Sequence, residues 1–333
     1  MKQGLPIHLL VLGILSLQGC GSIEVALGLR TRLDKLPVTA LSASLSPAPA
    51  LAPGKSGRLI ITATTSDGKQ LITVGPGHGK VLFDSFTFDA SVVQVSKKGK
   101  VSLPADPRQS DTQMPHIRIT ANGHPGIVAE LDVPVRYDIA FAAHFSGQTG
   151  SSGFNGSDGL AGADGSTGSL DPANPSPGGN GTNGGDGGNG QDGGDGQPGQ
   201  SVHVWVALLA GAHPLLQVRA ASTQREQFFL VDPNGGTLAI DANGGSGGSG
   251  GAAGRGGRGG AGGIGSPNGS AGLDGLEGMR GHDGSGGAPG SIIVSIDPQA
   301  KPFLDRLKLS IKSGNGVPGR AAEILTEPVA PLW

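Results

Sequence analysis

Glycine at every third position is the feature that most limits what this chain can fold into. The repeat runs without a break through residues 147–168 and again through 178–199, and a third array covers 245–290 with one gap at Ser266-Pro267-Asn268. In a helix with three residues per turn, this spacing places all the glycines along one line, where no side chain keeps another backbone away. The arrays therefore predict polyproline II rods that pack closely together.

Two assemblies can use such rods: a collagen triple helix made from three chains, or a bundle of antiparallel rods folded within one chain. Collagen-like repeats contain roughly 15–20% proline, whereas these triplets hold few prolines. Extra glycines at 179, 185, 188 and 194 would loosen a triple helix but widen a packing face. Apolar segments typical of strands, such as 202–209 and 291–296, interrupt the arrays. The sequence favours the single-chain bundle, and we expect each array to fold back on itself to match the length of these strands.

Residues 37–145 have a different composition. Here short segments of alternating apolar and polar residues are separated by turn residues. One of them, Arg58–Thr64, is rich in β-branched residues and ends at Ser66-Asp67-Gly68. Similar segments recur about every 8–12 residues, which is typical of a β-sandwich. The predicted fold class is therefore all-β, with a sandwich over 37–145 and a glycine-rich domain of polyproline II rods packed with β-strands over 146–333.

The N-terminus has the pattern of a cleavable export signal. Lys2 precedes a mostly apolar run, residues 5–17, which is too short to span a bilayer as a helix of about 20 apolar residues. The run ends in Leu17-Gln18-Gly19-Cys20, which resembles the lipobox of bacterial lipoproteins. The resemblance implies a signal peptide at 1–19, acylation of Cys20 and, because no aspartate follows the cysteine, transfer to the outer membrane. Residues 20–36 would then form a tether.

An ordinary signal peptide followed by a free thiol is the alternative at this end of the chain. Cys20 is the only cysteine among the 333 residues, so it has no partner for an internal disulfide. A lone exposed thiol is a liability in an oxidising compartment, and acylation removes it. The sequence leaves open whether the domains would face the cell surface or the periplasm.

Three wider resemblances carry expectations about architecture. Segments such as 41–51 and 92–101 make residues 37–145 similar to bacterial Ig-like domains. Gly184–Gly190 running into Val202–Val206 resembles the glycine-rich N-terminal fold of the Obg GTPases, whose GTPase domain is absent here. The whole order of lipobox, sandwich, glycine arrays and short tail resembles collagen-like outer-membrane lipoproteins of the myxobacterial type. These resemblances imply location and architecture, and they imply no activity.

Several motifs suggest chemistry, and each also has a plainer interpretation. The unit repeated at 178–186 and 187–195 resembles the calcium-binding nonapeptide, but glycine occupies the position that needs a large aliphatic residue. The aspartates between 146 and 200, without any Lys or Arg, leave weak calcium binding open. Gly254–Gly260 matches an RGG box, for which two exposed arginines on a solvated rod are the simpler interpretation. Trp205 lies on an apolar strand and is expected to pack in the core.

The sequence predicts no catalytic site, no metal site and no cofactor. The eight histidines are scattered without a paired metal-ligand spacing. A phosphate-binding loop at 54–56 would require glycine five residues earlier, where Pro49 stands. A net charge of −2 gives no general attraction to nucleic acid. We therefore expect a non-enzymatic structural or adhesive protein that contacts the membrane through its lipid anchor. The alternative is a surface module that binds an envelope polysaccharide or a protein through the repeat face.

Overall fold

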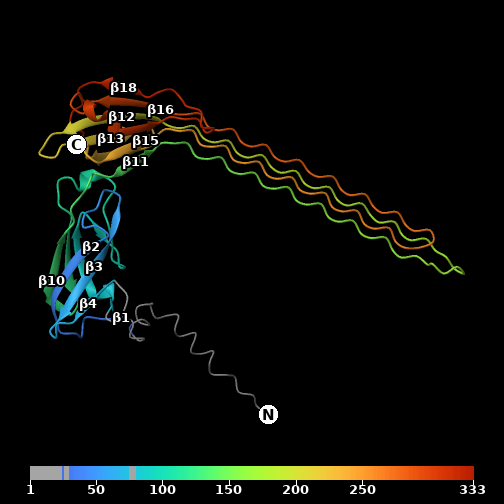
Figure 1. Ribbon diagram of the computed structural model, residues 1–333, viewed down its shortest axis with the longest axis horizontal. Helices are drawn as coiled ribbons and strands as arrows, with labels where there is room; N and C mark the ends of the chain where they lie inside the picture. Colours follow the sequence, from blue (N-terminus) through green and yellow to red (C-terminus); the bar gives the residue numbers. More distant parts are fainter. Residues whose placement is uncertain (1–24, 26–29, 75–79) are drawn as a thin grey trace, which may run out of the picture. The chain divides into compact units, whose positions relative to one another are not determined.

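The computed structural model describes residue 25 and residues 30–74 and 80–333 (Figure 1). The predicted signal peptide and Cys20 lie outside the described residues. Regular structure in the described chain is almost entirely β: it forms four sheets, including a curled half-barrel. None of the described helices is long and apolar enough to cross a membrane. The chain divides into two units, the first holding residues up to 139 with 228–236 and 333, the second holding 140–227 and 237–332.

The first unit builds one apolar core from a seven-stranded sheet and a three-stranded sheet. The larger sheet has the order β1-β5-β4-β3-β8-β7, with β2 also paired to β3. Its strands are β1 (Arg30–Thr31), β2 (Val38–Ser46), β3 (Ser56–Thr65), β4 (Gln70–Ile72), β5 (Lys80–Val81), β7 (Gln94–Val95) and β8 (Lys100–Ser102). The smaller sheet is antiparallel, in the order β10-β9-β6. Its strands are β6 (Phe86–Ser91), β9 (His116–Ala121) and β10 (His124–Asp132), and short 3-10 turns lie at η2 (Phe83–Ser85) and η3 (Pro107–Gln109).

Alternation of side chains explains this core. In β3 every second residue is buried, and Leu59 and Ile61 are completely buried. Ile117 and Ile119 join the same core from β9. The expected β-structure is confirmed, but this is not a plain Ig-like sandwich, because β5 pairs in parallel with both β1 and β4. Alternation specifies which face of a strand is buried and does not specify the direction of such short edge strands, so the sequence pattern could not show this.

The core also begins earlier than the predicted sandwich. Leu33 has no exposed surface and belongs to the same apolar cluster as Ile61. It precedes residue 37, so part of the segment expected as a tether is packed into the first unit.

The second unit contains the other two sheets, except for strand residues 228–231, which belong to the first unit. One is parallel, in the order β11-β15-β17, with β11 (Ala140–His144), β15 (Thr237–Asp241) and β17 (Leu307–Ser310). The other has the order β14-β13-β12-β16-β18. Its strands are β12 (Ser201–Leu209), β13 (Leu215–Ala221), β14 (Glu226–Val231), β16 (Ser291–Ile296) and β18 (Glu323–Thr326), and the 3-10 turn η4 (Lys301–Arg306) precedes β17. β16 is parallel to both β12 and β18.

Four extended segments leave these sheets and run together as the long arm in Figure 1. We call them rod 1 (147–168), rod 2 (178–199), rod 3 (244–265) and rod 4 (269–290). Every third residue of a rod, a glycine, donates its backbone N–H to a carbonyl of a neighbouring rod, as Gly153 does to Ser249 and Gly184 to Leu273. This threefold repeat is that of polyproline II. Consecutive rods are antiparallel, so the predicted single-chain bundle is confirmed.

The rods are longer than the sequence led us to expect. Rods 1 and 2 are each unbroken, and only the third array turns back within itself, at Ser266–Asn268. A rod of about 22 residues at about 3.1 Å per residue is about 68 Å long, whereas a nine-residue strand such as β12 covers only about 30 Å. The expectation that each array folds back to match the strands is therefore wrong for the first two arrays. The rods are held by hydrogen bonds to one another rather than by packing against the sheets.

The path strand–rod–rod–strand occurs twice, and the two copies lie in register. Residue i of β11 pairs with residue i+97 of β15, and an offset of 97 continues into rods 1 and 3. β12 and β16 pair with an offset of 90, which continues into rods 2 and 4. A third copy from β17 to β18 has no long rods, and its Gly314 donates to Gly287 before the chain turns back. The sheets thus set the register of the arm.

Candidate functional site

Side-chain oxygens form a ladder along the arm. On rod 2, the Oδ1 atom of six successive Asn or Asp residues accepts a hydrogen bond of 2.6–2.9 Å from a backbone N–H of rod 4. These residues are Asn180, Asn183, Asp186, Asn189, Asp192 and Asp195. Rod 1 binds rod 3 in the same way through Asn155, Asp158 and Asp164. The ladder therefore satisfies backbone donors that the glycine hydrogen bonds leave over.

The ladder gives the aspartates of the repeated nine-residue unit a structural role. Their Oδ1 atoms accept hydrogen bonds from the backbone of a neighbouring rod, so part of the hydrogen-bonding capacity of the non-glycine positions is used inside the arm. Within the described ranges, no group of three or more His, Cys, Asp or Glu is placed so that it could hold a metal ion.

The glycines of the arm are of two kinds. A Cβ on Gly184 would lie 2.0 Å from the carbonyl oxygen of Gly257, and one on Gly256 would lie 2.0 Å from that of Gly275. These positions admit only glycine. The extra glycines of rod 2 are less tightly enclosed: the nearest atom to a Cβ on Gly185 would be the backbone nitrogen of Leu160, at 3.2 Å, and to one on Gly179 the Oγ of Ser166, at 2.6 Å. They line an outer face of the arm.

Large apolar side chains stand out from the arm. On rod 1, Phe154 is 75% exposed and Leu160 is 84% exposed. On rod 4, Leu273, Leu276 and Met279 follow at intervals of three residues and are 72–73% exposed. These five are the most exposed large apolar side chains of the described chain, and their concentration on the arm marks it as an interaction surface.

The arm carries more acidic than basic side chains. The four rods hold eight carboxylates and three arginines, which gives a net charge of −5. Arg255 and Arg258 of the RGG-like segment are both exposed on rod 3. Their spacing of three residues places them on one line of the rod. A net acidic arm does not attract nucleic acid.

Trp205 packs against its neighbours in the sheet. Its ring stacks on that of His203 with centroids 3.9 Å apart, and the guanidinium of Arg219 lies 4.6 Å from its centroid. Nε2 of His203 is 2.9 Å from Oγ of Ser295. Trp205 is half-buried rather than fully in the core, but these contacts agree with the packing role that was expected.

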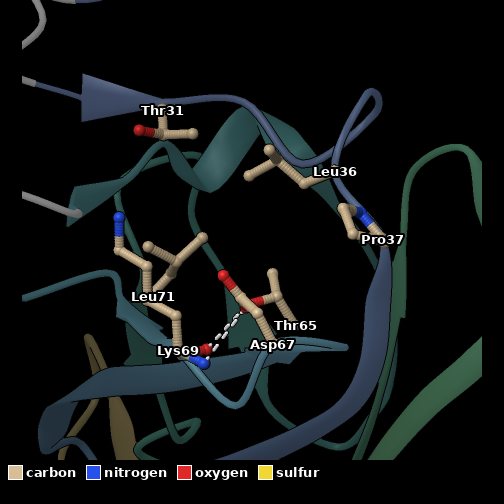
Figure 2. A pocket seen from close by; sticks show the side chains of 7 residues that line it. All are labelled: Thr31, Leu36, Pro37, Thr65, Asp67, Lys69 and Leu71. Carbon is tan, nitrogen blue, oxygen red and sulfur yellow. Dashed lines mark hydrogen bonds between the residues drawn. The ribbon is translucent and has the colours of Figure 1, made fainter.

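A cavity of about 300 Å³ lies in the first unit (Figure 2). It is lined by Thr31, Leu36, Pro37, Thr65, Asp67, Lys69 and Leu71. The Thr65 hydroxyl donates to Oδ1 of Asp67 at 2.5 Å and contacts the Lys69 carbonyl at 3.0 Å. The hydrogen bond from Thr65 holds the pKa of Asp67 below its ordinary value. Thr65, Asp67 and the backbone of Lys69 thus bind one another, and the volume is at the lower limit for small-molecule sites.

An exposed charged cluster joins β9 to β10. Nδ1 of His116 is 2.8 Å from Asp132, and Nε2 is 2.7 Å from Glu130, which also binds Arg118 at 3.1 Å. Hydrogen bonds from Asp132 and then Glu130 raise the pKa of His116. Each ring nitrogen faces a different carboxylate, so the cluster is an ion-pair network that links two strands.

Aromatic residues from distant parts of the chain meet in the first unit. Phe228 and Trp333 pack edge to face with centroids 5.6 Å apart, and the guanidinium of Arg108 lies 3.5 Å from the Phe228 centroid. Trp333 also donates a hydrogen bond to Asp111. Burial raises the pKa of Tyr137, which also interacts with Ser110 and Asp111. Trp333 is therefore held by ring packing and by a hydrogen bond.

Comparison with known proteins adds no relative. No protein-family model matches the chain, and no curated protein is significantly similar to it. The geometry of the arm is therefore the main guide to function. Cys20 lies outside the described residues, so its acylation stays a prediction.

Proposed function

We propose that this protein is a non-catalytic, lipid-anchored structural or adhesive protein of the bacterial outer membrane. The observation that carries the proposal is the double hydrogen-bond network of the arm, in which glycine N–H groups bind carbonyls and the Asn/Asp ladder binds further N–H groups. A segment bonded along its whole length opens rarely, and it therefore resists bending and proteolysis. These properties suit a spacer or a component of a surface layer.

The lipobox-like Leu17–Cys20 supports the anchor. Two or three acyl chains on one cysteine hold a protein firmly at a bilayer. The likeness to collagen-like lipoproteins and to Ig-like domains belongs to the proposal as well. For the likeness to the Obg glycine-rich fold, the repeated strand–rod–rod–strand path is the supporting observation.

The second candidate function is a binding module for an envelope polysaccharide or a protein. The line of Leu273, Leu276 and Met279 supports it, because exposed apolar side chains repeat there at a spacing of about 9 Å. Replacing Leu273 and Leu276 by Asp would abolish such binding and would leave the glycine contacts of rod 4 intact. A glycan array with the wild-type chain and this variant measures the effect, and equal signals from both would exclude this line as the binding site.

Protease treatment of intact cells tests the main proposal. We expect Cys20→Ala to leave the membrane fraction and to lack the mass of the acyl chains. Mass spectrometry and fractionation measure both, and a variant that matures and fractionates like the wild type would refute the lipid anchor. Loss of the wild-type protein on treatment of intact cells would place it on the surface. Protection until the outer membrane is opened would place it in the periplasm.

A further inference from the structure

One face of the arm carries no charged side chain. Residues three apart lie in one row along a rod, and we call such a row a line. The face consists of two lines: every third residue of rod 1 from Gln148 to Ser166, and every third residue of rod 2 from Gly179 to Gln197. The lines are adjacent, because a Cβ on Gly188 would lie 3.0 Å from Oγ of Ser157. All eight carboxylates and three arginines of the rods lie on other lines. We call these two lines the neutral face.

The neutral face is nearly symmetric about its centre. Ser157 and Gly188 are the middle residues of the two lines, and the hydrogen bond from Gly188 N to Ser157 O, 2.7 Å long, places them at the same level. On rod 1, Phe154 and Leu160 stand one triplet to either side of this centre. They are the two most exposed large apolar residues of the described chain, at 75% and 84%. A centre of this kind, with equivalent groups on both sides, is what a two-fold axis requires.

A two-fold axis through this centre, perpendicular to the rods and in the plane of the face, would bring a second copy onto it with its rods antiparallel. Each residue then meets the residue at the same distance on the other side of the centre. On rod 1, Phe154 meets the partner's Leu160, and Leu160 meets the partner's Phe154. Ser157 meets its own copy at the axis. The apolar side chains of the two copies are thereby buried against one another.

Under the same axis, the rod 2 line of one copy meets the rod 2 line of the other, and the two are complementary in side-chain size. Gln191 meets the partner's Gly185, and Gln197 meets the partner's Gly179. The remaining large residue, Thr182, meets the partner's glycine at position 194. Every larger side chain of this line therefore faces a glycine, which gives the extra glycines of rod 2 a role in the contact between copies as well as inside the arm.

The face is large enough for a specific contact. Seven triplets at about 3.1 Å per residue span about 60 Å, and two rods about 5 Å apart present a width of about 10 Å. The contact would bury about 600 Å² on each copy and about 1,200 Å² in total, the lower end for specific interfaces. No charge loses its water in this contact, because all charged side chains of the rods lie on other lines.

We infer that the neutral face is a docking site for a second copy of this chain, with the two arms antiparallel about an axis at Ser157 and Gly188. The interface is isologous, so it closes at two copies and forms no filament. This pairing goes beyond the proposed function and does not depend on the lipid anchor, because every residue that it uses lies on rods 1 and 2.

The oligomeric state of the full chain carrying Cys20→Ala tests this inference. Sedimentation velocity between 1 and about 100 μM is expected to show a monomer–dimer equilibrium with a micromolar Kd. Phe154→Asp together with Leu160→Asp brings carboxylates together at the centre and weakens the dimer at least about 100-fold. The matched control, Leu273→Asp with Leu276→Asp on rod 4, leaves the Kd unchanged. A monomer at every concentration, or equal weakening by both pairs, would overturn the inference.

Single cysteines test the geometry in the same Cys20→Ala background. Ser157→Cys forms a disulfide dimer, because the residue lies at the axis. Phe154→Cys alone does not, because its copy in the partner lies six residues away, about 19 Å along the rod. A mixture of Phe154→Cys and Leu160→Cys chains forms the disulfide heterodimer. Thr149→Cys serves as the control that stays monomeric, because it lies outside the neutral face, on the same line of rod 1 as the ladder residues. Efficient self-linking of Phe154→Cys would contradict the antiparallel register.

Discussion

The first unit and the arm of the second unit are stabilised in opposite ways. In the first unit, side chains such as Leu59, Ile61 and Ile117 leave water completely, and burial of their apolar surface drives folding. In the arm, the interior contains backbone and glycine, and the large apolar side chains are outside. Hydrogen bonds between backbones take the place of a core. The comparison shows that a stable extended structure needs no apolar interior when every rod finds a partner for its backbone.

The two regions consequently differ in what they tolerate. A core accepts another apolar side chain of similar volume at a modest cost in stability. The interior of the arm has no room for any side chain, because its backbones are in contact with one another. Each inner hydrogen bond contributes only about 0.5–1.5 kcal/mol, so the arm depends on the number of bonds and on the absence of any Cβ.

The largest effect is expected from a single methyl group inside the arm. Gly184→Ala would place a Cβ 2.0 Å from the Gly257 carbonyl oxygen, and separating the rods there should destabilise the arm by about 4 kcal/mol or more. Limited proteolysis and circular dichroism measure the loss. The neighbouring substitution Gly185→Ala is the matched control, since the nearest atom to its Cβ would be 3.2 Å away, a tight contact that a shift of a few tenths of an ångström relieves. Equal damage from both would show that glycine acts in the arm through chain entropy rather than through close contact.

A deletion in the core of the first unit is expected to have the next largest effect. Ile61→Ala should lower the free energy of unfolding of the first unit by about 2–5 kcal/mol, because it leaves a cavity in a fully buried site. Chemical denaturation of the first unit, followed by the fluorescence of Trp333, measures it. Ile72→Ala, at a position 37% exposed, is the control and should cost much less. Loss of the arm's circular dichroism at the same denaturant concentration would contradict separate stabilisation of the two regions.

Substitutions in the ladder should have moderate effects. Asp186→Ala removes the acceptor of the Leu276 N–H bond, 2.7 Å long, and should cost about 1 kcal/mol. Asp186→Asn keeps an Oδ1 acceptor and should be nearly neutral, as the alternation of Asn and Asp along rod 2 suggests. Thermal unfolding of the arm distinguishes them. A variant Asp186→Asn as unstable as Asp186→Ala would show that charge, and not hydrogen bonding, is what the ladder supplies.

The smallest effect concerns the pH dependence of the first unit. Asp132 and Glu130 raise the pKa of His116 above its ordinary value of about 6.5. Protonation therefore favours the folded state: the contribution is full below about pH 6.5 and is lost as the pH rises through the raised pKa. His116→Gln should make the first unit slightly less stable at pH 5–6 and should match the wild type near pH 9. Because the cluster is exposed, the effect should also shrink in high salt, and an unchanged difference at every pH would refute it.

Much of the fold follows from local patterns in the sequence. Period-three glycine predicts the rods, and alternation in segments such as Arg58–Thr64 predicts the strands. The number of glycine lines on a rod carries further information. Rod 3 has two such lines, interrupted only at Ala253, because both are covered by neighbouring rods, as Gly256 and Gly257 show, whereas rods 1 and 4 have only one. An edge rod could therefore have been distinguished from an inner rod before the structure was known.

Other features could not be predicted, because they depend on register between distant segments. The offsets of 97 and 90 that join the two strand–rod–rod–strand copies follow from β-pairing and have no local signal. The roles of Asp186 and Asn183 were missed for the same reason: a repeated Asx residue suits a metal, a solvated face or a ladder equally well. Likewise, Ser157 and Gly188 show a common centre only when the hydrogen bond between their rods is known.

The ladder also determines how the arm ages chemically. Asn180, Asn183 and Asn189 are each followed by glycine, the pair most prone to deamidation, in which the next backbone nitrogen attacks the side-chain carbonyl. In the arm, the nitrogens of Gly181, Gly184 and Gly190 are bonded to carbonyls of rod 4, and each asparagine Oδ1 is bonded to a rod 4 N–H. The attacking atom and its target are both held, so the folded arm keeps its asparagines while a denatured one converts them to aspartate and isoaspartate.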